Sequence, residues 1–430
     1  MRFEFVATQK QSTLGGRPAL EALAQQFDLW QKIHARPGLD PRTRTSHGYS
    51  PERLVAQLLY SFCSGRASLA DAERLNDEPR ARQLARMEKF ADQTQLGEGL
   101  RQQNDTSSSA LWPLIAPFVQ WVIARADAAR WTFAGRADVF FDDTPIEVFG
   151  PSFEGAQINY NGDRALSWQT LWLGPFLVGG ELGVPGDVSG AGPALLQTPR
   201  PLWRDRAGDF LADRGSSRAE YLQALEQAGF TQWSVSYNKW TTGPERTAAA
   251  LPESFWSAAK KTRWRDGVEV TEQHADLRHT VAGSEFTFPL AAARWKKDDE
   301  MLWRYACVAH DPRRIDAGAV LARHRLKGGK EQLCKEVLRG LDLHHPPCAS
   351  LPANRMFYAL AALASNLMKA VQLLCLPDAC QRWTVPTLLK PMVRRLVARV
   401  EVAASWLDWW RSWEARWWRA GAVAPPTPSG

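Results

Sequence analysis

The chain has 430 residues, of which 45% are hydrophobic and 23% charged. This composition excludes a wholly disordered chain, and the length predicts two or three domains with ample room for a buried core. Lys and Arg number 53 against 46 Asp and Glu, so the formal net charge is +7, a basic excess that is compatible with a nucleic-acid partner without requiring one.

Nothing in the sequence predicts export or a membrane span. Residues 1–16 lack the apolar run of a signal peptide. The longest apolar stretch, residues 357–376, is interrupted by Asn366, Lys369 and Gln372, which predicts a buried core helix. The six cysteines show no C-x-x-C spacing and predict free thiols in a reducing compartment. Together these features predict a cytoplasmic protein.

Residues 1–130 have the pattern of a helical N-terminal domain. Ser50 and Pro51 form a helix start, with a capping hydroxyl and then a proline in the first turn. The apolar residues that follow at helical spacing are Leu54, Val55, Leu58, Leu59 and Phe62. Further helices are predicted from Ser68 and over residues 109–128. A helical bundle with interspersed arginines can bind DNA, although most such bundles do not.

Near residue 137 the period changes, and residues 131–240 predict an α/β layer. A β-type run over 138–141 stops at Asp142 and Asp143, and a second run over 209–212 stops at Asp213. A Gly/Pro loop is predicted over 179–193, a helix over 217–228 and a strand over 232–237. The order strand, helix, strand is typical of an α/β layer.

The remaining sequence predicts three further parts. Residues 241–305 have the pattern of a β-rich insertion with charged turns. Helices return in residues 306–380, at 330–338 and 353–376. Residues 381–430 form a basic C-terminal region, in which the stripe of tryptophans between 406 and 418 predicts packing on the body and the flanking arginines predict phosphate contacts. The Pro-rich end, 423–430, is predicted to be disordered.

Three acids at the ends of predicted elements carry the chemical information. Asp142 and Asp213 close β-type runs, and Glu331 stands at the start of a helix. Active sites of α/β sheets collect at strand ends. Three carboxylates that meet at one point can hold two Mg²⁺ ions, and two such ions promote in-line phosphoryl displacement. Composition alone does not show convergence, because an acid after a strand is more often a solvated turn residue.

The residues around these acids resemble three sequence blocks of bacterial insertion-sequence transposases of the DDE class. The residues that match the first-Asp block are Asp142, Thr144, Gly150, Glu154, Gly155, Asn161 and Gly162. Residues 212–216 and the helix up to 230 resemble the second-Asp block, and residues 324–338 resemble the Glu block. The chain is most similar to the insertion-sequence group numbered thirteen-eighty, a relative of the hairpin-forming, cut-and-paste transposases, and the resemblance spans most of its length.

This resemblance implies a ribonuclease-H-like α/β core with a β-rich insertion between the second Asp and the Glu, preceded by a helical DNA-binding domain and followed by a helical C-terminal region. It implies metal-dependent DNA cleavage at transposon ends and transfer of the 3′-OH ends into target DNA, through a hairpin in relatives. Asp142, Asp213 and Glu331 are then the catalytic residues and the ligands of two Mg²⁺ ions, which Mn²⁺ can replace. The implied partners are terminal inverted repeats, target DNA and a second copy of the chain.

The Glu block departs from the group's signature of Tyr, Arg, Glu and Lys. His324 stands at the Tyr position, Lys327 at the Arg position and Leu338 at the Lys position, with Arg339 beside it. Lys327 keeps the charge but loses the bidentate fork of an arginine. His324 remains a weaker, pH-dependent candidate for phosphate contact.

The first metal ligand has an alternative, because Asp143 follows Asp142 directly. The Asp-x-Thr register and the distance to Gly150 favour Asp142.

Candidate DNA contacts follow from the same resemblance. The predicted phosphate contacts are His324, Lys327, Lys335, Arg339, Arg394 and Arg395. Lys335 can instead pair with Glu331 one helical turn away. In hairpin-forming relatives an aromatic residue of the insertion receives a flipped base. The candidates for that role are Trp240, Trp256, Trp264 and Trp295, each of which can also be a core residue.

Three other functions remain open from the sequence. A nuclease on the same core would cut DNA without joining it. A transposase-derived DNA-binding protein would bind without cleaving. A basic globular protein with a different partner would show no steep salt dependence of DNA binding.

Overall fold

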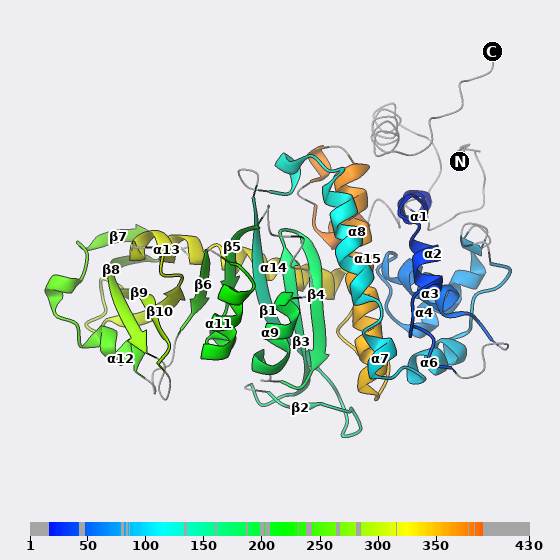
Figure 1. The fold of residues 1–430 in the computed structure, drawn as a ribbon, viewed down its shortest axis with the longest axis horizontal. Coiled ribbons are helices and arrows are strands. Elements are labelled where there is room, and N and C mark those ends of the chain that lie inside the picture. The colour runs from blue at the N-terminus through cyan, green and yellow to red at the C-terminus, as the bar shows by residue number, and fades with distance from the viewer. Residues whose placement is uncertain are drawn as a thin grey trace, which may run out of the picture.

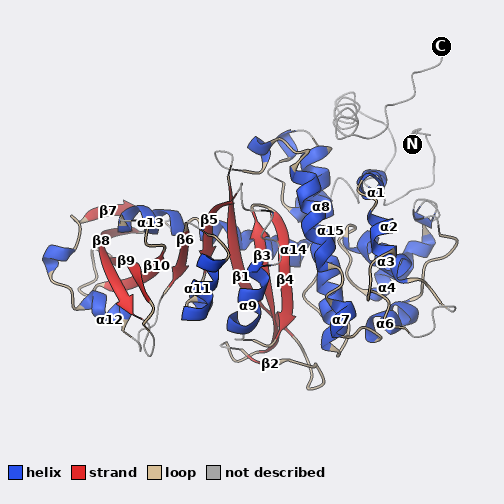
Figure 2. Cartoon of the chain, viewed as in Figure 1, coloured by secondary structure: helices blue, strands red, loops and turns tan. Residues whose placement is uncertain are grey.

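A computed structural model describes residues 17–389, apart from the gaps 43–47, 79–80, 83–84, 86, 133–135, 160, 186–187, 198–201, 203–206, 231, 238–242, 264–266, 281–284, 315, 377 and 382. In the described residues, helices and strands form a mixed α/β fold around one open sheet (Figure 2). Arg394, Arg395, Trp240, Trp264 and the predicted tryptophan stripe lie outside the described residues.

The N-terminal part is helical, as predicted. Its helices are α1 (Arg17–Gln26), α2 (Leu29–His34), α3 (Pro51–Phe62), α4 (Leu69–Glu73), α6 (Gln93–Arg101), α7 (Asp105–Ser108) and α8 (Trp112–Ile123). The predicted helix start at Ser50 and Pro51 is confirmed, but the predicted capping by the Ser50 hydroxyl is wrong, because this hydroxyl donates to Glu52 Oε1 at 2.6 Å. Ser68 caps α4 by accepting a hydrogen bond from the Asp71 amide at 3.0 Å. The helix predicted over residues 109–128 is shorter in the structure, where α8 begins at Trp112 and ends at Ile123.

The sheet has ten strands in the described residues. They are β1 (Ala137–Glu147), β2 (Gln157–Ile158), β3 (Arg164–Leu173), β4 (Phe176–Gly183), β5 (Ala207–Ala212), β6 (Trp233–Ser236), β7 (Lys260–Arg263), β8 (Glu269–Thr280), β9 (Thr287–Lys296) and β10 (Arg304–His310). Their order is β2-β3-β1-β5-β6-β10-β9-β8-β7, and β4 pairs with β3. The strands β1, β5 and β6 are parallel, whereas β3 and β4 on one side and β10 to β7 on the other are antiparallel to their neighbours.

Two sequence predictions about this sheet are wrong. The first strand does not stop at Asp142, because residues 142–147 continue to pair with β3. The predicted Gly/Pro loop over 179–193 instead contains the end of β4 and the helix α9 (Val188–Gln197). Glycine fits β4 because α8 lies against it: a Cβ on Gly180 would lie 2.8 Å from the ring of Trp112.

The predicted insertion, residues 241–305, is β-rich and continues the main sheet. The helix α12 (Pro244–Ala249) leads into the antiparallel strands β7, β8 and β9. Strand β10 then joins β9 to β6, so the insertion strands form the outer part of the same sheet (Figure 1). Helix α13 (Ala317–His324) packs on this part, with Ala317, Val320 and Leu321 against the apolar side chains of β9 and β10.

Helices cover both faces of the central strands. Helix α11 (Ala219–Gln227) lies on one face, where Tyr221 packs on Phe141 of β1 with ring centroids 5.5 Å apart. Helix α14 (Lys327–Gly340) lies on the other face, behind the sheet in the view of Figure 1. The predicted helix 330–338 is therefore longer by three residues at its start and two at its end.

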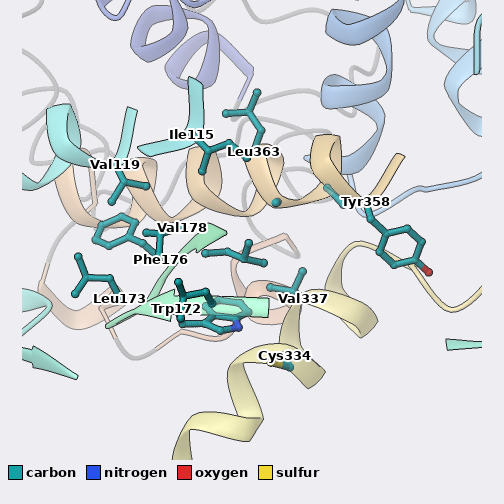
Figure 3. Packing of buried hydrophobic residues seen from close by; sticks show 14 of the residues in the cluster. Ile115, Val119, Trp172, Leu173, Phe176, Val178, Cys334, Val337, Tyr358 and Leu363 are labelled. Atoms are coloured by element: carbon teal, nitrogen blue, oxygen red, sulfur yellow. The ribbon is translucent and has the colours of Figure 1, made fainter. Parts of the chain in front are cut away.

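Helix α15 (Leu351–Leu374) is the core helix that the apolar stretch predicts. Apart from its first turn it is buried nearly all round, between the N-terminal helices and strand β4 (Figure 1). Leu363 of α15, Ile115 of α8 and Phe176 of β4 belong to one hydrophobic core, whose packing around α15 is drawn in Figure 3. In the described residues it is the one helix long and apolar enough to cross a membrane, and this burial explains its composition. The last described helix is α16 (Val385–Leu389).

Candidate functional site

Asp142 and Asp213 lie where the parallel pairing between β1 and β5 ends. The last residues that pair these two strands are Phe141 and Ala212, so Asp142, within β1, and Asp213, directly after β5, are the next residues along each chain segment. Side chains at the carboxyl ends of adjacent parallel strands lie close together, which is why binding sites form there. The strand pairing therefore places two acids that are far apart in the sequence beside one another.

Helix α14 brings a third acid and a lysine to this edge. The Nζ of Lys327 lies 2.8 Å from Asp213 Oδ2, 3.3 Å from Glu331 Oε1 and 3.7 Å from Asp142 Oδ1. Lys327, Glu331 and Cys334 share one face of the helix, because residues separated by three or four positions do so. The three acids singled out in the sequence thus converge on one ammonium group.

The cluster is closed on the protein side and open to solvent on the other. The side chain of Lys327 is 4% exposed, whereas those of Asp213 and Glu331 are 59% and 40% exposed. Burial disfavours the ammonium, but the charges of Asp213, Asp142 and Glu331 outweigh that effect and raise the pKa of Lys327. Lys327 is therefore a charged, buried group that depends on the carboxylates for its stability.

Asp142 is held in place by its neighbours. The Thr144 hydroxyl donates a hydrogen bond to Asp142 Oδ2 at 3.0 Å, which leaves Oδ1 directed toward Lys327. Below it, Cys334 is buried with its sulfur 3.7 Å from the Thr170 hydroxyl. Burial, together with the charge of Asp142, raises the pKa of the Cys334 thiol, so this thiol stays neutral. All six cysteines are free and buried, as the sequence predicts.

Asp143 lies on the other face of β1. Successive side chains of a strand point to opposite faces, and the hydroxyl of Ser167 on β3 donates a hydrogen bond to Asp143. Asp143 makes no ion pair with Lys327 in the structure, whereas Asp142 does. Of the two neighbouring acids that the sequence left as alternatives, the structure brings Asp142 to the cluster.

His324 does not lie where a phosphate could reach it. Its Nδ1 and Nε2 are 2.9 and 2.8 Å from the hydroxyls of Ser234 and Ser236 on β6, and its side chain is buried. Burial lowers the pKa of His324 to about 4, which keeps the ring neutral. The expectation that His324 contacts phosphate is corrected, because both ring nitrogens are engaged inside the fold, where His324 joins the end of α13 to β6.

A second group of charges supports the site from within, and the sequence analysis missed it. Arg323 of α13 pairs with both Asp138 and Asp209, which are buried and lie four residues before Asp142 and Asp213. Lys330 lies 3.6 Å from Asp138, and Arg314 pairs with Asp209. The sequence does contain a signal for this group: Asp138 and Asp142 are four residues apart, and so are Asp209 and Asp213. An even spacing within a strand places both acids of a pair on the same face.

The insertion is tied to the start of α14 through a buried acid. Glu272 of β8 accepts hydrogen bonds from Arg325, which lies two residues before Lys327, and from His274 at 2.7 Å. Burial opposes the charge of Glu272, but these two partners hold the pKa of Glu272 at about 2. The position of Lys327 thus depends on the outer part of the sheet as well as on β1 and β5.

The other predicted DNA contacts that the structure describes have different surroundings. Lys335 and Arg339 are exposed on α14. Glu331 forms an ion pair with Lys327 instead of the alternative pair with Lys335. Trp256 is buried, and the Arg294 guanidinium lies 4.5 Å from its ring centroid, so this indole is not open to a flipped base. Trp295 is partly buried on β9 and packs against the apolar cluster of α13.

The three carboxylates are suitable ligands for a hard divalent cation, but in this structure they form ion pairs with Lys327. Three carboxylates are the ligand type that Mg²⁺ and Mn²⁺ prefer, and two of them, Asp213 and Glu331, are open to solvent. Within the described residues, however, no three His, Cys, Asp or Glu side chains form a ready-made set of metal ligands. The carboxylates surround the Nζ of Lys327, so that a positive charge already stands at their centre.

Comparison with known protein families and with curated protein sequences finds no match to the chain.

Proposed function

We propose that the chain is a DDE-class DNA transposase that cleaves transposon ends and transfers their 3′-OH groups into target DNA. The observation that carries the proposal is the convergence of Asp142, Asp213 and Glu331 within 3.7 Å of one point, the Nζ of Lys327. The sequence resemblance assigns the metal-binding role to these same three acids.

Asp142, Asp213 and Glu331 would hold the divalent ions. Divalent ions held there would supply a lowered pKa of bound water and charge neutralisation at phosphate oxygens. The chain itself contributes position: Thr144 orients Asp142, and Arg323 ties α13 to β1 and β5 through Asp138 and Asp209. The exposure of Asp213 and Glu331 gives a DNA phosphate access to the carboxylates.

The fold supports a ribonuclease-H-like assignment. The proposed core consists of β1, β3, β4, β5 and β6 with α11 and α14, and the antiparallel strands β7–β9 fall between the second Asp and the Glu, where the resemblance implies an insertion. Lys335 and Arg339 on the exposed side of α14 are proposed phosphate contacts, and the N-terminal helices and C-terminal region are proposed to bind the inverted repeats. The protein would act as a homodimer on paired ends, in the cytoplasm at the nucleoid.

An excision and re-integration assay tests the proposal. The donor carries a marker between the DNA segments that flank the gene, and wild type is compared with Asp142→Asn, Asp213→Asn and Glu331→Gln. We expect wild type to excise and re-insert the marker and each variant to lose both activities. Glu226→Gln is the matched control, because Glu226 is an exposed acid on α11, away from the cluster.

Each other outcome identifies a different function. Excision without re-integration would indicate a nuclease that cuts but does not join. Salt-sensitive DNA binding without cleavage in Mg²⁺ or Mn²⁺ would indicate a DNA-binding derivative. DNA binding that does not weaken steeply with salt would contradict a nucleic-acid partner.

A further inference from the structure

Lys327 occupies a place that neither burial nor helix formation favours. Its side chain is 4% exposed, and a buried ammonium is costly unless it is paired. Lys327 is also the first residue of α14, where the helix dipole repels a positive charge. The pairs with Asp142, Asp213 and Glu331 are the interactions that offset both costs.

The start of α14 has little local stability of its own. Leu326 at the N-cap makes no side-chain capping bond, and Gly328 and Gly329 follow Lys327. Glycine destabilises a helix relative to alanine. Side-chain ion pairs therefore contribute to holding the first turn: Lys327 pairs with the carboxylates, Arg325 pairs with Glu272, and Lys330 lies 3.6 Å from Asp138.

We infer that Lys327 is an internal counter-ion that assembles the three carboxylates without metal and competes with divalent cations for them. This inference rests on the proposed function, because it assumes that Asp142, Asp213 and Glu331 are metal ligands. The ammonium and a divalent ion repel one another and need the same carboxylate oxygens. A cation that enters past the exposed Asp213 and Glu331 displaces Nζ, and the long, unbranched lysine side chain can move away without a shift of the sheet.

The exchange gives Lys327 two successive partners. Without metal, its ammonium neutralises carboxylates that would otherwise repel one another. With metal bound, the ammonium is released beside the site and becomes available to an anion such as a DNA phosphate. Lys327 thereby lowers the affinity of the DNA-free protein for metal, and the presence of a phosphate that accepts the released ammonium raises this affinity.

Calorimetric titration of Mn²⁺ into the DNA-free, full-length protein tests the inference. We expect Lys327→Met to bind Mn²⁺ about tenfold more tightly than wild type, equivalent to about 1.4 kcal/mol, because no ammonium has to be displaced. Lys327→Met is also expected to melt at a lower temperature than wild type without metal and to gain more from saturating Mn²⁺. Lys260→Met removes an exposed charge from the outer strand β7, away from the cluster, and is expected to leave Mn²⁺ affinity within about twofold.

Lys327→Arg keeps the positive charge and provides a second variant if Lys327→Met does not fold without metal. The Mn²⁺ affinity of Lys327→Arg is expected to remain near that of wild type. If Lys327→Arg instead binds Mn²⁺ about tenfold more tightly than wild type, the inference is overturned. Unchanged or weaker binding by folded Lys327→Met, with binding still abolished by Asp142→Asn, would overturn the inference and leave the metal site intact. Absence of Mn²⁺ binding in both wild type and folded Lys327→Met would overturn the metal site as well.

Discussion

The Nζ of Lys327 lies 2.8 Å from Oδ2 of Asp213 and thereby joins the first residue of α14 to the residue directly after β5. The two residues are separated in the sequence by β6, the whole insertion, β10 and α13. Their contact therefore joins two elements, β5 and α14, that are far apart in the sequence and adjacent in the fold. The geometry leads to four expectations that experiments can check.

The two neighbouring acids of β1 should differ sharply in importance. Asp142→Asn removes a charge from the cluster and is expected to reduce DNA cleavage at least about a hundredfold, since metal ligands carry the reaction. Asp143→Asn changes a side chain on the opposite face, where Ser167 is its partner, and is expected to stay within about threefold of wild type. Cleavage of end-labelled transposon ends in Mg²⁺ measures both, and the reverse order of effects would make Asp143 the ligand.

His324 should make stability depend on pH in a defined window. The unfolded imidazole titrates near 6.5, whereas burial lowers the pKa of folded His324 to about 4. Between these values the unfolded state binds the additional proton, so the free energy of unfolding falls as pH drops from 6.5 to 4, by up to about 3 kcal/mol. Urea denaturation of wild type and His324→Gln should show a difference that changes within this window. Parallel profiles of the two proteins would contradict the neutral, buried histidine.

Arg323 should be important for stability, although it does not contact the cluster itself. Arg323→Met leaves the buried carboxylates of Asp138 and Asp209 with fewer partners and is expected to cost about 3 kcal/mol. The value lies at the low end for a broken buried pair, because Lys330 and Arg314 remain nearby. Arg339→Met, at an exposed position of α14, is the control and should change the free energy of unfolding by less than about 0.5 kcal/mol. Equal denaturation midpoints for the two variants would show that the buried acids do not need Arg323.

Asn366 should be required inside α15 despite its polarity. Its side-chain amide accepts a hydrogen bond from the Leu177 amide at 3.0 Å and donates one to the Leu177 carbonyl at 2.7 Å, within the core. Asn366→Leu leaves both groups of β4 buried without this partner and is expected to cost about 2–4 kcal/mol. Asn366→Gln, measured in the same thermal denaturation series, tests whether the amide alone suffices. A Leu variant as stable as wild type would mean that β4 satisfies these groups in another way.

Local patterns in the sequence predicted several elements correctly. The starts at Ser50 and Ser68, the strands that end at Ala212 and Ser236 and the helix over α11 all depend on neighbouring residues. The polar residues that interrupt the apolar stretch show the limit of this reasoning. Asn366 and Gln372 favoured a buried core helix, but nothing local indicated that Gln372 would donate hydrogen bonds to the Cys380 and Trp383 carbonyls.

Pairing between strands decided what local patterns could not. The β-type run of β1 did not end at its acids, because pairing with β3 extends the strand to Glu147. The same pairing sets which face each acid occupies, since a shift of one residue exchanges the two faces of a strand. It therefore separated Asp142 from Asp143, which the sequence placed side by side.

Periodicity, capping and turn signals act over a few residues, and they were enough to predict the N-terminal helices, the β-rich insertion and the core helix α15. They did not predict that Asp142 lies inside β1, that Asp142, Asp213 and Glu331 meet around Lys327, or that His324 is buried against Ser234 and Ser236. These contacts join residues far apart in the chain. Their geometry depends on strand order, register and helix packing, which emerge when the whole sheet buries its two faces.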